Sequence, residues 1–261
     1  METDPLLLID QERYPLHDLT DASGPLVAAA RKEFEAGGLT TLDGFLRPGT
    51  AGRIVAHALK DAESGSHRFA GTSDVFFRAV PGDERRTGVT YTKSDVPYDR
   101  IDPRSPVRVL YEWEPLLAFV SAVVGRPVFR SADPLGAAVV QIQRDGDQQD
   151  WHFDSSEFTV LLHAQGPEEG GALQYAVRCR EQVLRDQEVL DRIMAGDPSI
   201  PVREVATVPG RLVLHAGNVS MHRVTPTAGS VPRVNATLTF NSRPGVMLSD
   251  HIRRMHFGRL R

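Results

Sequence analysis

The segment DQQDWHFDSSEF, residues 147–158, holds a histidine and a carboxylate that can reach one metal ion. His152 and Asp154 are two residues apart in a strand-like context. Side chains of a strand alternate between its two faces, so residues i and i+2 point the same way. One imidazole and one carboxylate are therefore predicted to share a face, and a third ligand must come from another segment.

The histidines of the later segments are the candidates for that third ligand. His163 and His215 lie in EFTVLLHAQ and RLVLHAG, which are apolar and strand-like, so burial in the core is their expected role. His222 lies in the polar, turn-rich stretch SMHRVTP, where it can face the mouth of a pocket. Two histidines and one carboxylate on one face of a metal leave open positions, which suits Fe(II). Zinc accepts the same ligands, so the triad alone does not name the metal.

Arg233 follows His222 at the start of RVNATLTF. A guanidinium inside a pocket is costly unless it meets an anion, and it binds a carboxylate through two parallel hydrogen bonds. The dicarboxylate 2-oxoglutarate would bind iron with its keto-acid end and Arg233 with its other end. The alternative is that Arg233 is a surface cation of a strand.

Other residues are candidates for orienting the ligands or for binding a substrate. Gln143 and Gln149 can orient the metal ligands, or be solvated. Arg78, in VFFRAVPGDERR, can clamp a carboxylate from a segment that covers the site, with a surface role as the alternative. Trp151 and Phe158 flank the ligand strand, and core packing is their expected role.

The first part of the chain, residues 1–126, is predicted to be mainly a helical support and lid. Apolar residues at helical spacing predict helices over 24–38, 50–65 and 105–125, with Thr50 as an N-cap. Residues 64–88 are rich in turn formers and are expected to be irregular.

The second part, residues 127–261, changes character. Eight short segments rich in Val, Ile, Thr and Phe, most of them separated by turn residues, predict an antiparallel sandwich or barrel. One helix is expected over 181–197. No linker divides the chain, so a single domain covering residues 1–261 is expected.

Composition excludes several classes of protein. The net charge of −4 offers no basic excess for nucleic acid, and the basic C-terminal stretch RRMHFGRLR is expected to be a solvated tail. A single cysteine, Cys179, excludes an intrachain disulfide and favours a reducing compartment. We find no signal peptide and no apolar run near the roughly 18 residues of a membrane span, so a cytoplasmic protein without membrane contacts is expected.

The series WHFD…EGGALQYA…HRVTP…PRVNATLTF…HFGR resembles the Fe(II)/2-oxoglutarate oxygenases. The resemblance implies an α+β fold, the double-stranded β-helix (jelly roll, cupin-like), with an N-terminal helical support layer. It implies that His152, Asp154 and His222 bind iron, that Arg233 binds 2-oxoglutarate, and that O₂ is the other cosubstrate. Asn235 matches one of the polar positions that line the pocket in this family, and Thr237 matches another.

A closer likeness, carried by HRVTP…G…PR and the closing FGR, is to the BesD/HalD group of amino-acid halogenases and hydroxylases. Halogenases of this group have glycine where Asp154 stands, so the carboxylate implies hydroxylation. Positions that bind lysine in the group are Gln149 and Ser155 here, and its C-terminal Trp pair is matched at best by His256 and Phe257. Lysine itself is therefore not the expected substrate.

These inferences predict a 2-oxoglutarate-dependent dioxygenase of secondary metabolism. It would hydroxylate an unactivated C–H bond of a free amino acid or similar small metabolite, releasing succinate and CO₂. A homodimer is one option for its assembly. The alternatives are desaturation, cyclisation or halogenation at the same site, a non-catalytic jelly-roll binding module, or a zinc or manganese hydrolase of cupin type.

Overall fold

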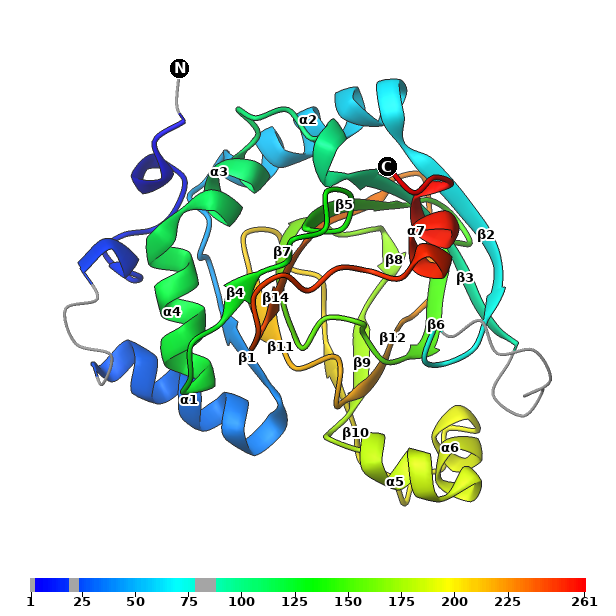
Figure 1. Ribbon diagram of the computed structural model, residues 1–261. Helices are drawn as coiled ribbons and strands as arrows, with labels where there is room; N and C mark the ends of the chain where they lie inside the picture. The colour runs from blue at the N-terminus through cyan, green and yellow to red at the C-terminus, as the bar shows by residue number, and fades with distance from the viewer. Residues whose placement is uncertain (1–2, 19–23, 78–87) are drawn as a thin grey trace.

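The computed structural model describes residues 3–18, 24–77 and 88–261, and these residues build one curled antiparallel sheet with helices around it (Figure 1). The strands of this 12-stranded sheet are β1 Leu39–Leu42, β2 His67–Ser73, β3 Val89–Pro97, β4 Phe129–Arg130, β5 Ala138–Gln143, β6 Gln148–His152, β7 Phe158–Gln165, β9 Leu173–Ala176, β10 Val202–Val205, β11 Leu212–His215, β12 Met221–Val224 and β14 Arg233–Asn241. A separate two-stranded sheet pairs β8 Glu169–Gly170 with β13 Thr227–Ala228.

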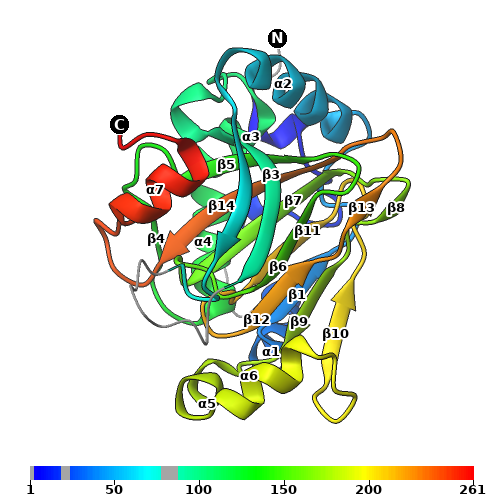
Figure 2. The same cartoon turned by 90° about the vertical axis from the view of Figure 1, so that its right-hand side faces the viewer.

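Seven α-helices are described outside the sheet. They are α1 Pro25–Gly37, α2 Thr50–Gly65, α3 Pro106–Glu112, α4 Glu114–Val124, α5 Arg180–Arg185, α6 Gln187–Met194 and α7 Asp250–Phe257. Figures 1 and 2 show α1 to α4 against one outer side of the roll, α7 away from them, and α5 with α6 at one end. Short 3₁₀ turns lie at Pro5–Leu7, Leu16–Asp18 and Tyr98–Arg100.

The order of the strands makes the roll. Hydrogen-bonded neighbours run β1-β11-β7-β14-β5-β3-β6-β12-β9-β10, with β2 on β3 and β4 on β14. β3 pairs with β5 along one stretch and with β6 along another. It therefore joins the strands β1, β11, β7, β14 and β5 to the strands β6, β12, β9 and β10. The expected α+β jelly roll is confirmed, and each of the eight predicted strand segments contains a strand.

Alternation along the strands separates a packing face from a polar interior. On β14, Val234, Ala236 and Leu238 belong to the large core under the helices. Asn235 and Thr237, between them, line a cavity inside the roll. The period of two in RVNATLTF therefore decides which side chains hold the fold and which are available for binding.

The expected helix over 105–125 is two helices. Trp113 is extended between α3 and α4 because the residue after it, Glu114, is followed by Pro115, which cannot donate a helical hydrogen bond. The guanidinium of Arg130 donates to the carbonyl oxygens of Tyr111 (2.6 Å) and Glu112 (3.0 Å) at this break. The carbonyl groups that the helix leaves free are thus paired.

Two other helix predictions need correction. The helix expected over 181–197 is divided at Asp186, whose carboxylate accepts from the backbone N–H of Glu188 and so begins α6. The N-cap of α2 is Gly49, not Thr50. Thr50 instead donates its hydroxyl to the carbonyl of Leu8 at 3.0 Å, a tertiary contact that local sequence does not reveal.

Strands also occur where helices or irregular structure were expected. β2, at His67–Ser73, lies in the stretch expected to be irregular, and its order comes from a continuous ladder with β3. β1 and β3 also belong to the sheet, so the β core extends into residues 1–126. Long-range pairing, rather than local propensity, forms these strands.

The C-terminal stretch is not a solvated tail. Residues of RRMHFGRLR continue α7, and Met255 and Phe257 are buried. Arg253 forms an ion pair with the buried Asp133 at 2.7 Å, which attaches α7 to the roll. Arg253 of this stretch therefore has a structural partner that composition alone does not indicate.

Candidate metal centre and adjoining cavities

His152, Asp154 and His222 meet inside the roll, as the sequence predicts. His152 ends β6, and its Cα partner on β12 is His222. One ligand atom from each of the three side chains lies within 4.8 Å of the others. The Oδ1 atom of Asp154 is 3.3 Å from Nε2 of His222 and 3.8 Å from Nε2 of His152. The three groups can hold one metal ion.

The backbone fixes the orientation of both imidazoles. Nδ1 of His152 is 2.7 Å from the carbonyl oxygen of Asp150, and Nδ1 of His222 is 2.9 Å from that of Ser220. A carbonyl oxygen only accepts, so Nδ1 carries the proton in each ring and Nε2 carries the lone pair in the neutral form. Both lone pairs then face the carboxylate, which is the arrangement that a metal-binding histidine requires.

Asp154 is held from three sides. Thr159 donates its hydroxyl to Oδ2 at 2.9 Å, and Asn218 donates its side-chain amide to the backbone carbonyl at 2.9 Å. A Cβ atom at Gly217 would lie 2.1 Å from Oδ2 and 3.0 Å from Cε1 of His222. Glycine at 217 is therefore required for the close approach of carboxylate and imidazole.

Burial and mutual attraction set the protonation of the triad. Burial lowers the pKa of His152 and the charge on His222 lowers it further, which leaves it an unprotonated ligand. Burial alone would raise the pKa of Asp154, but the neighbouring His222 outweighs it and the net pKa is lowered. The carboxylate is therefore ionised and available to a cation.

Arg233 lines a cavity of about 50 Å³ inside the roll. His152 and Asp154 also belong to the lining of this cavity. Nε of Arg233 donates to the carbonyl of Gly171 and the hydroxyl of Thr207, both at 3.0 Å, and Nη1 donates to Gln143 Oε1 at 2.8 Å. All three acceptors are uncharged, and burial lowers the pKa of Arg233 to about 10. Within residues 3–18, 24–77 and 88–261 no carboxylate pairs with it.

Unpaired polar atoms accompany this buried cation. Asn235 Oδ1, Thr237 Oγ1 and His215 Nε2 line the same cavity, are buried, and have no hydrogen-bond partner within the described part of the chain. Buried polar atoms are normally satisfied, so a polar ligand fits this cavity, and Thr237 and His215 can donate hydrogen bonds to oxygen atoms of that ligand. His215, expected to be a core residue, is buried, and its ring lies 4.7 Å from that of His222.

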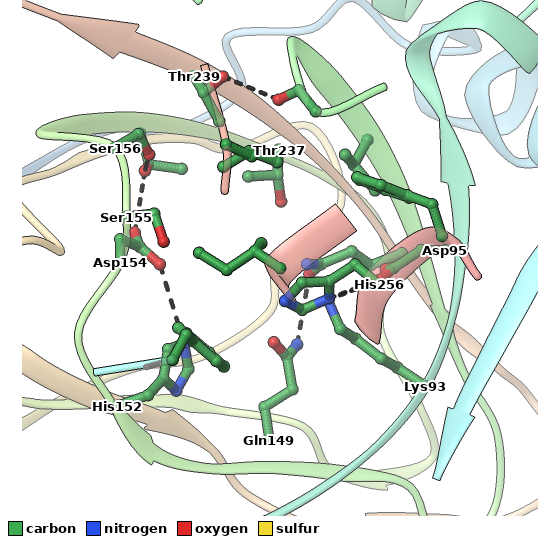
Figure 3. A pocket seen from close by; sticks show the side chains of 18 residues that line it. Lys93, Asp95, Gln149, His152, Asp154, Ser155, Ser156, Thr237, Thr239 and His256 are labelled. Carbon is green, nitrogen blue, oxygen red and sulfur yellow. Dashed lines mark hydrogen bonds and ion pairs between the residues drawn. The ribbon is translucent and has the colours of Figure 1, made fainter. Parts of the chain in front are cut away.

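The larger cavity, of about 100 Å³, adjoins the cavity of Arg233 and shares Gln149, His152 and Asp154 with it. Figure 3 shows Asp154, His152 and Ser155 at one side and Lys93, Asp95 and His256 at the other. The lining comes from five strands, the loop after β6 and α7. It comprises Phe77, Lys93, Asp95, Gly136, Val139, Gln141, Gln149, His152, Asp154, Ser155, Ser156, Thr159, Thr237, Thr239, Leu248, Ile252, His256 and Phe257.

Three of the predicted substrate residues, Gln149, Ser155 and Phe257, line this larger cavity. Trp151 does not, because the register between β6 and β12 shifts after His222, so that Gln149 and His152 both face inward. Trp151 is buried in the core with Arg223 stacked on its ring. Arg78 lies outside the described residues.

The ligand-orienting roles of the two glutamines differ from the expectation. Gln143 contacts Arg233, and Gln149 donates to Gln141 Oε1 at 3.3 Å, so neither is hydrogen-bonded to a metal ligand. Phe158 is a core residue that packs against Phe34 at 6.2 Å between ring centroids. The orienting contacts come instead from two backbone carbonyl groups, and from a threonine that was not singled out.

Lys93 and Asp95 line the larger cavity, and no sequence motif described above includes them. They lie on β3 in the stretch YTKSD, where two opposite charges stand two residues apart in a strand. That spacing is a usable signal, because both charges must then point to the same face. The expectation that residues 1–126 are mainly helical gives this strand signal no weight.

Comparison with known proteins agrees with this geometry. The fold and the three-ligand site place the chain in the 2-oxoglutarate oxygenase superfamily. The family model of halogenase D (HalD) matches residues 25–252, so the chain belongs to that family. No curated protein matches the sequence. None of the described helices is long and apolar enough to cross a bilayer.

Several solved structures share the fold at low sequence identity. The α-ketoglutarate-dependent epimerase SnoN from nogalamycin biosynthesis, in complex with Fe³⁺, α-ketoglutarate and nogalamycin RO, has a TM-score of 0.60 at 14% identity and covers 83% of each chain. AviO1 from Streptomyces viridochromogenes Tue57 has a TM-score of 0.58 at 20% identity, covering 84% of this chain and 96% of its own. The carbocyclase SnoK, also from nogalamycin biosynthesis, has a TM-score of 0.57 at 14% identity and covers 92% of each chain. At these identities the likeness concerns the fold alone.

Proposed function

We propose that the protein is an Fe(II)- and 2-oxoglutarate-dependent dioxygenase that hydroxylates an unactivated C–H bond of a free amino acid or a similar small metabolite. The observation that carries the proposal is the pairing of two adjoining cavities. One holds Arg233 without a counter-charge in the described residues, and both share the His152 and Asp154 side chains. A dicarboxylate cosubstrate and a small substrate can thus reach one metal from different sides.

The chain's own groups fit the proposed metal and cosubstrate. His152, Asp154 and His222 would hold Fe(II), since two imidazoles and a carboxylate on one face are the donors of non-haem iron oxygenases. With 2-oxoglutarate and O₂ bound, iron supplies the oxidising chemistry that converts C–H to C–OH and leaves succinate and CO₂.

Arg233 would bind the distal carboxylate of 2-oxoglutarate. Its guanidinium is kept in place by Gln143 and by the carbonyl of Gly171, so its position does not depend on the ligand. Asn235 and Thr237 offer further polar atoms along the same wall. The cavity therefore provides both the charge and the hydrogen-bonding groups for a dicarboxylate.

Asp154 favours hydroxylation over halogenation. In the halogenases that the sequence resembles, glycine at this position opens a metal coordination site for chloride. Here the carboxylate fills that place, with Thr159 holding one oxygen and His222 3.3 Å from the other. The family match keeps halogenation as the second candidate function.

The test is a succinate-release screen with Fe(II), 2-oxoglutarate, O₂ and a panel of free amino acids and small metabolites, with and without chloride. Mass spectrometry then identifies the product, and a gain of one oxygen is expected. The variant His222→Ala should lose succinate release, whereas His17→Ala, which changes an exposed histidine outside both cavities, should keep it. A chlorinated product would favour halogenation, and full activity without His222 would contradict the assigned metal site.

A further inference from the structure

A charged cluster lies in the wall of the larger cavity, away from the metal ligands. Lys93 is 2% exposed and Asp95 is 1% exposed, and both project inward from β3. Nζ of Lys93 lies 3.0 Å from Asp95 Oδ2. Nδ1 of His256, on α7, lies 3.1 Å from the same oxygen. A lysine, a carboxylate and an imidazole are thus brought together at the end of the cavity opposite Asp154 (Figure 3).

The charge state of the cluster follows from its contacts. Burial alone would raise the pKa of Asp95, but Lys93 and His256 outweigh it and the net pKa is lowered, so the carboxylate is ionised. Burial and the charge on Lys93 lower the pKa of His256, so the imidazole is neutral and donates through Nδ1. The cluster therefore presents one ammonium and one carboxylate side by side.

One of the two oxygens of the Asp95 carboxylate has no hydrogen-bond partner among the described residues. Both of its contacts are made by Oδ2, whereas Oδ1 is buried and accepts no hydrogen bond from the described residues. An ammonium group has three N–H donors, and among the described residues Lys93 forms an ion pair with Asp95 alone, which leaves donors for another acceptor. Because buried charged groups are rarely left unsatisfied, this arrangement points to a ligand.

We propose that Lys93 and Asp95 bind the head group of an α-amino acid as a zwitterion. Asp95 Oδ1 accepts hydrogen bonds from the substrate ammonium, and Nζ of Lys93 donates to the substrate carboxylate. An adjacent pair of opposite charges is complementary to a second such pair turned head to tail. His256 is a positioning residue, because its hydrogen bond holds Oδ2 and thereby leaves Oδ1 available to the ligand. This inference rests on the proposed function, whose substrate class it deepens.

The location of the cluster has a consequence for the reaction. Figure 3 places Lys93 and Asp95 across the cavity from Asp154 and His152. The lining of the cavity includes Val139, which offers an apolar surface to an aliphatic side chain. A head group held at the far end directs a side-chain carbon, and not the α-carbon, toward the metal.

The first experiment uses the unaltered protein and needs no variant to fold. Anaerobic protein with Fe(II) and 2-oxoglutarate is titrated by calorimetry with the free amino acids, and the tightest binder is compared with two analogues. One analogue lacks the amino group and the other lacks the carboxylate. Each charge-assisted contact that is lost should weaken binding by about 10- to 100-fold. Equal binding of the parent and either analogue overturns the proposal.

The second experiment separates recognition from stability. Asp95→Asn keeps the shape of the side chain and removes its charge, so binding of the parent amino acid should weaken by about 10- to 100-fold. The amino-free analogue should lose much less. Asp147→Asn is the matched control, since Asp147 is also 1% exposed and pairs with a cation, Arg68, but lines neither cavity. Similar losses in both variants would overturn the proposal.

The outcome also distinguishes this inference from the proposed function. Binding of 2-oxoglutarate to the Fe(II) protein gives a weak visible absorption band that requires no substrate. If the band does not form, the proposed function fails. If the band forms but no free amino acid binds, or if variants of Lys93 and Asp95 bind as the unaltered protein does, the proposed function stands and the zwitterion site is wrong.

Discussion

Thr159 contributes to the metal site through a single hydrogen bond. Its hydroxyl holds Oδ2 of Asp154 at 2.9 Å, which leaves Oδ1 facing the two imidazoles. We predict that Thr159→Val weakens metal binding by about 10- to 100-fold, the usual effect of removing a partner that orients a ligand. Titration with Co(II) or Ni(II), followed by absorption, measures it.

The control for this variant is Thr227→Val. Thr227 is also buried, and its hydroxyl donates to backbone carbonyl groups, but it lines neither cavity. Both variants lose a buried hydrogen bond, and only Thr159 touches a metal ligand. Equal metal affinity in the two variants would show that Asp154 does not depend on Thr159 for its orientation.

Arg233 is predicted to determine affinity for 2-oxoglutarate. Arg233→Met removes the charge, so the apparent KM for 2-oxoglutarate should rise by about 30-fold or more, corresponding to about 2 kcal/mol. Arg233→Lys should recover only part of this, because an ammonium cannot form two parallel hydrogen bonds to a carboxylate. Steady-state succinate assays give the KM, and metal titration should be unchanged. An unaltered KM in Arg233→Met would mean that the cosubstrate binds elsewhere.

At the scale of the element, α7 brings His256 and Phe257 to the cavity, and the buried carboxylate of Asp133 holds this helix in place. Asp133 accepts from the backbone N–H groups of Leu135, Gly136 and Leu248, and it pairs with Arg253 at 2.7 Å. The helix is thus attached to the loop before β5 by a side chain that does not touch the cavity.

We predict that Arg253→Met loosens α7 and leaves the metal centre intact. Breaking a buried ion pair costs about 3 kcal/mol because Asp133 keeps its buried charge. Hydrogen exchange should accelerate across Asp250–Phe257, and substrate affinity should fall while metal affinity does not. Arg254→Met is the control, since Arg254 lies on the same helix and is exposed. Unchanged exchange in Arg253→Met would show that apolar contacts of α7 suffice.

The sequence predicts the elements around the ligands better than those that complete the roll. The eight segments predicted as strands after residue 127 are rich in Val, Ile, Thr and Phe and each contains a strand, and α1 ends at a glycine as expected. β2 carries no such pattern and exists through its ladder with β3. The breaks inside two expected helices depend on Pro115 and Asp186, local signals whose effect competes with a strong helical period.

The candidate site also contains some residues that the sequence predicts and others that only the folded structure reveals. His152, Asp154, His222 and Arg233 are found from residue type and spacing, because a motif concentrates them in sequence. The inward direction of Gln149 requires the register shift of β6, which no pattern of residues announces. The contact of His256 with Asp95 joins residues far apart in the chain and follows only from the folded structure.

At the scale of the molecule, buried carboxylates make folding stability depend on pH. Burial alone would raise the pKa of Asp133 and of Asp147, but hydrogen bonds outweigh it and both net pKa values are lowered. A depressed pKa contributes stability that is complete above the unfolded value of about 3.9 and is lost as pH falls toward the folded value.

We therefore predict that the free energy of unfolding decreases as pH falls below about 4. Asp147→Asn removes one of the contributing carboxylates, so its stability should be lower near neutral pH and should fall less steeply in acid. Urea unfolding followed by circular dichroism between neutral and acidic pH measures both slopes. Parallel slopes for the variant and the unaltered chain would assign the acid sensitivity to other groups.

Along the edge opposite β2, β3 bonds to β6 at Tyr91 and Thr92 and to β5 from Ser94 to Pro97, so the strand that carries Asp95 is paired with the strand that carries His152. Hydrogen-bonded strands hold their spacing closely, and the interval between the proposed head-group site at Asp95 and the candidate metal ligand His152 is therefore set by backbone, not by a movable loop. Substrates should then be sorted by length. Adding or removing one methylene from an accepted molecule should leave the position of attack unchanged when carbons are counted from the carboxyl end.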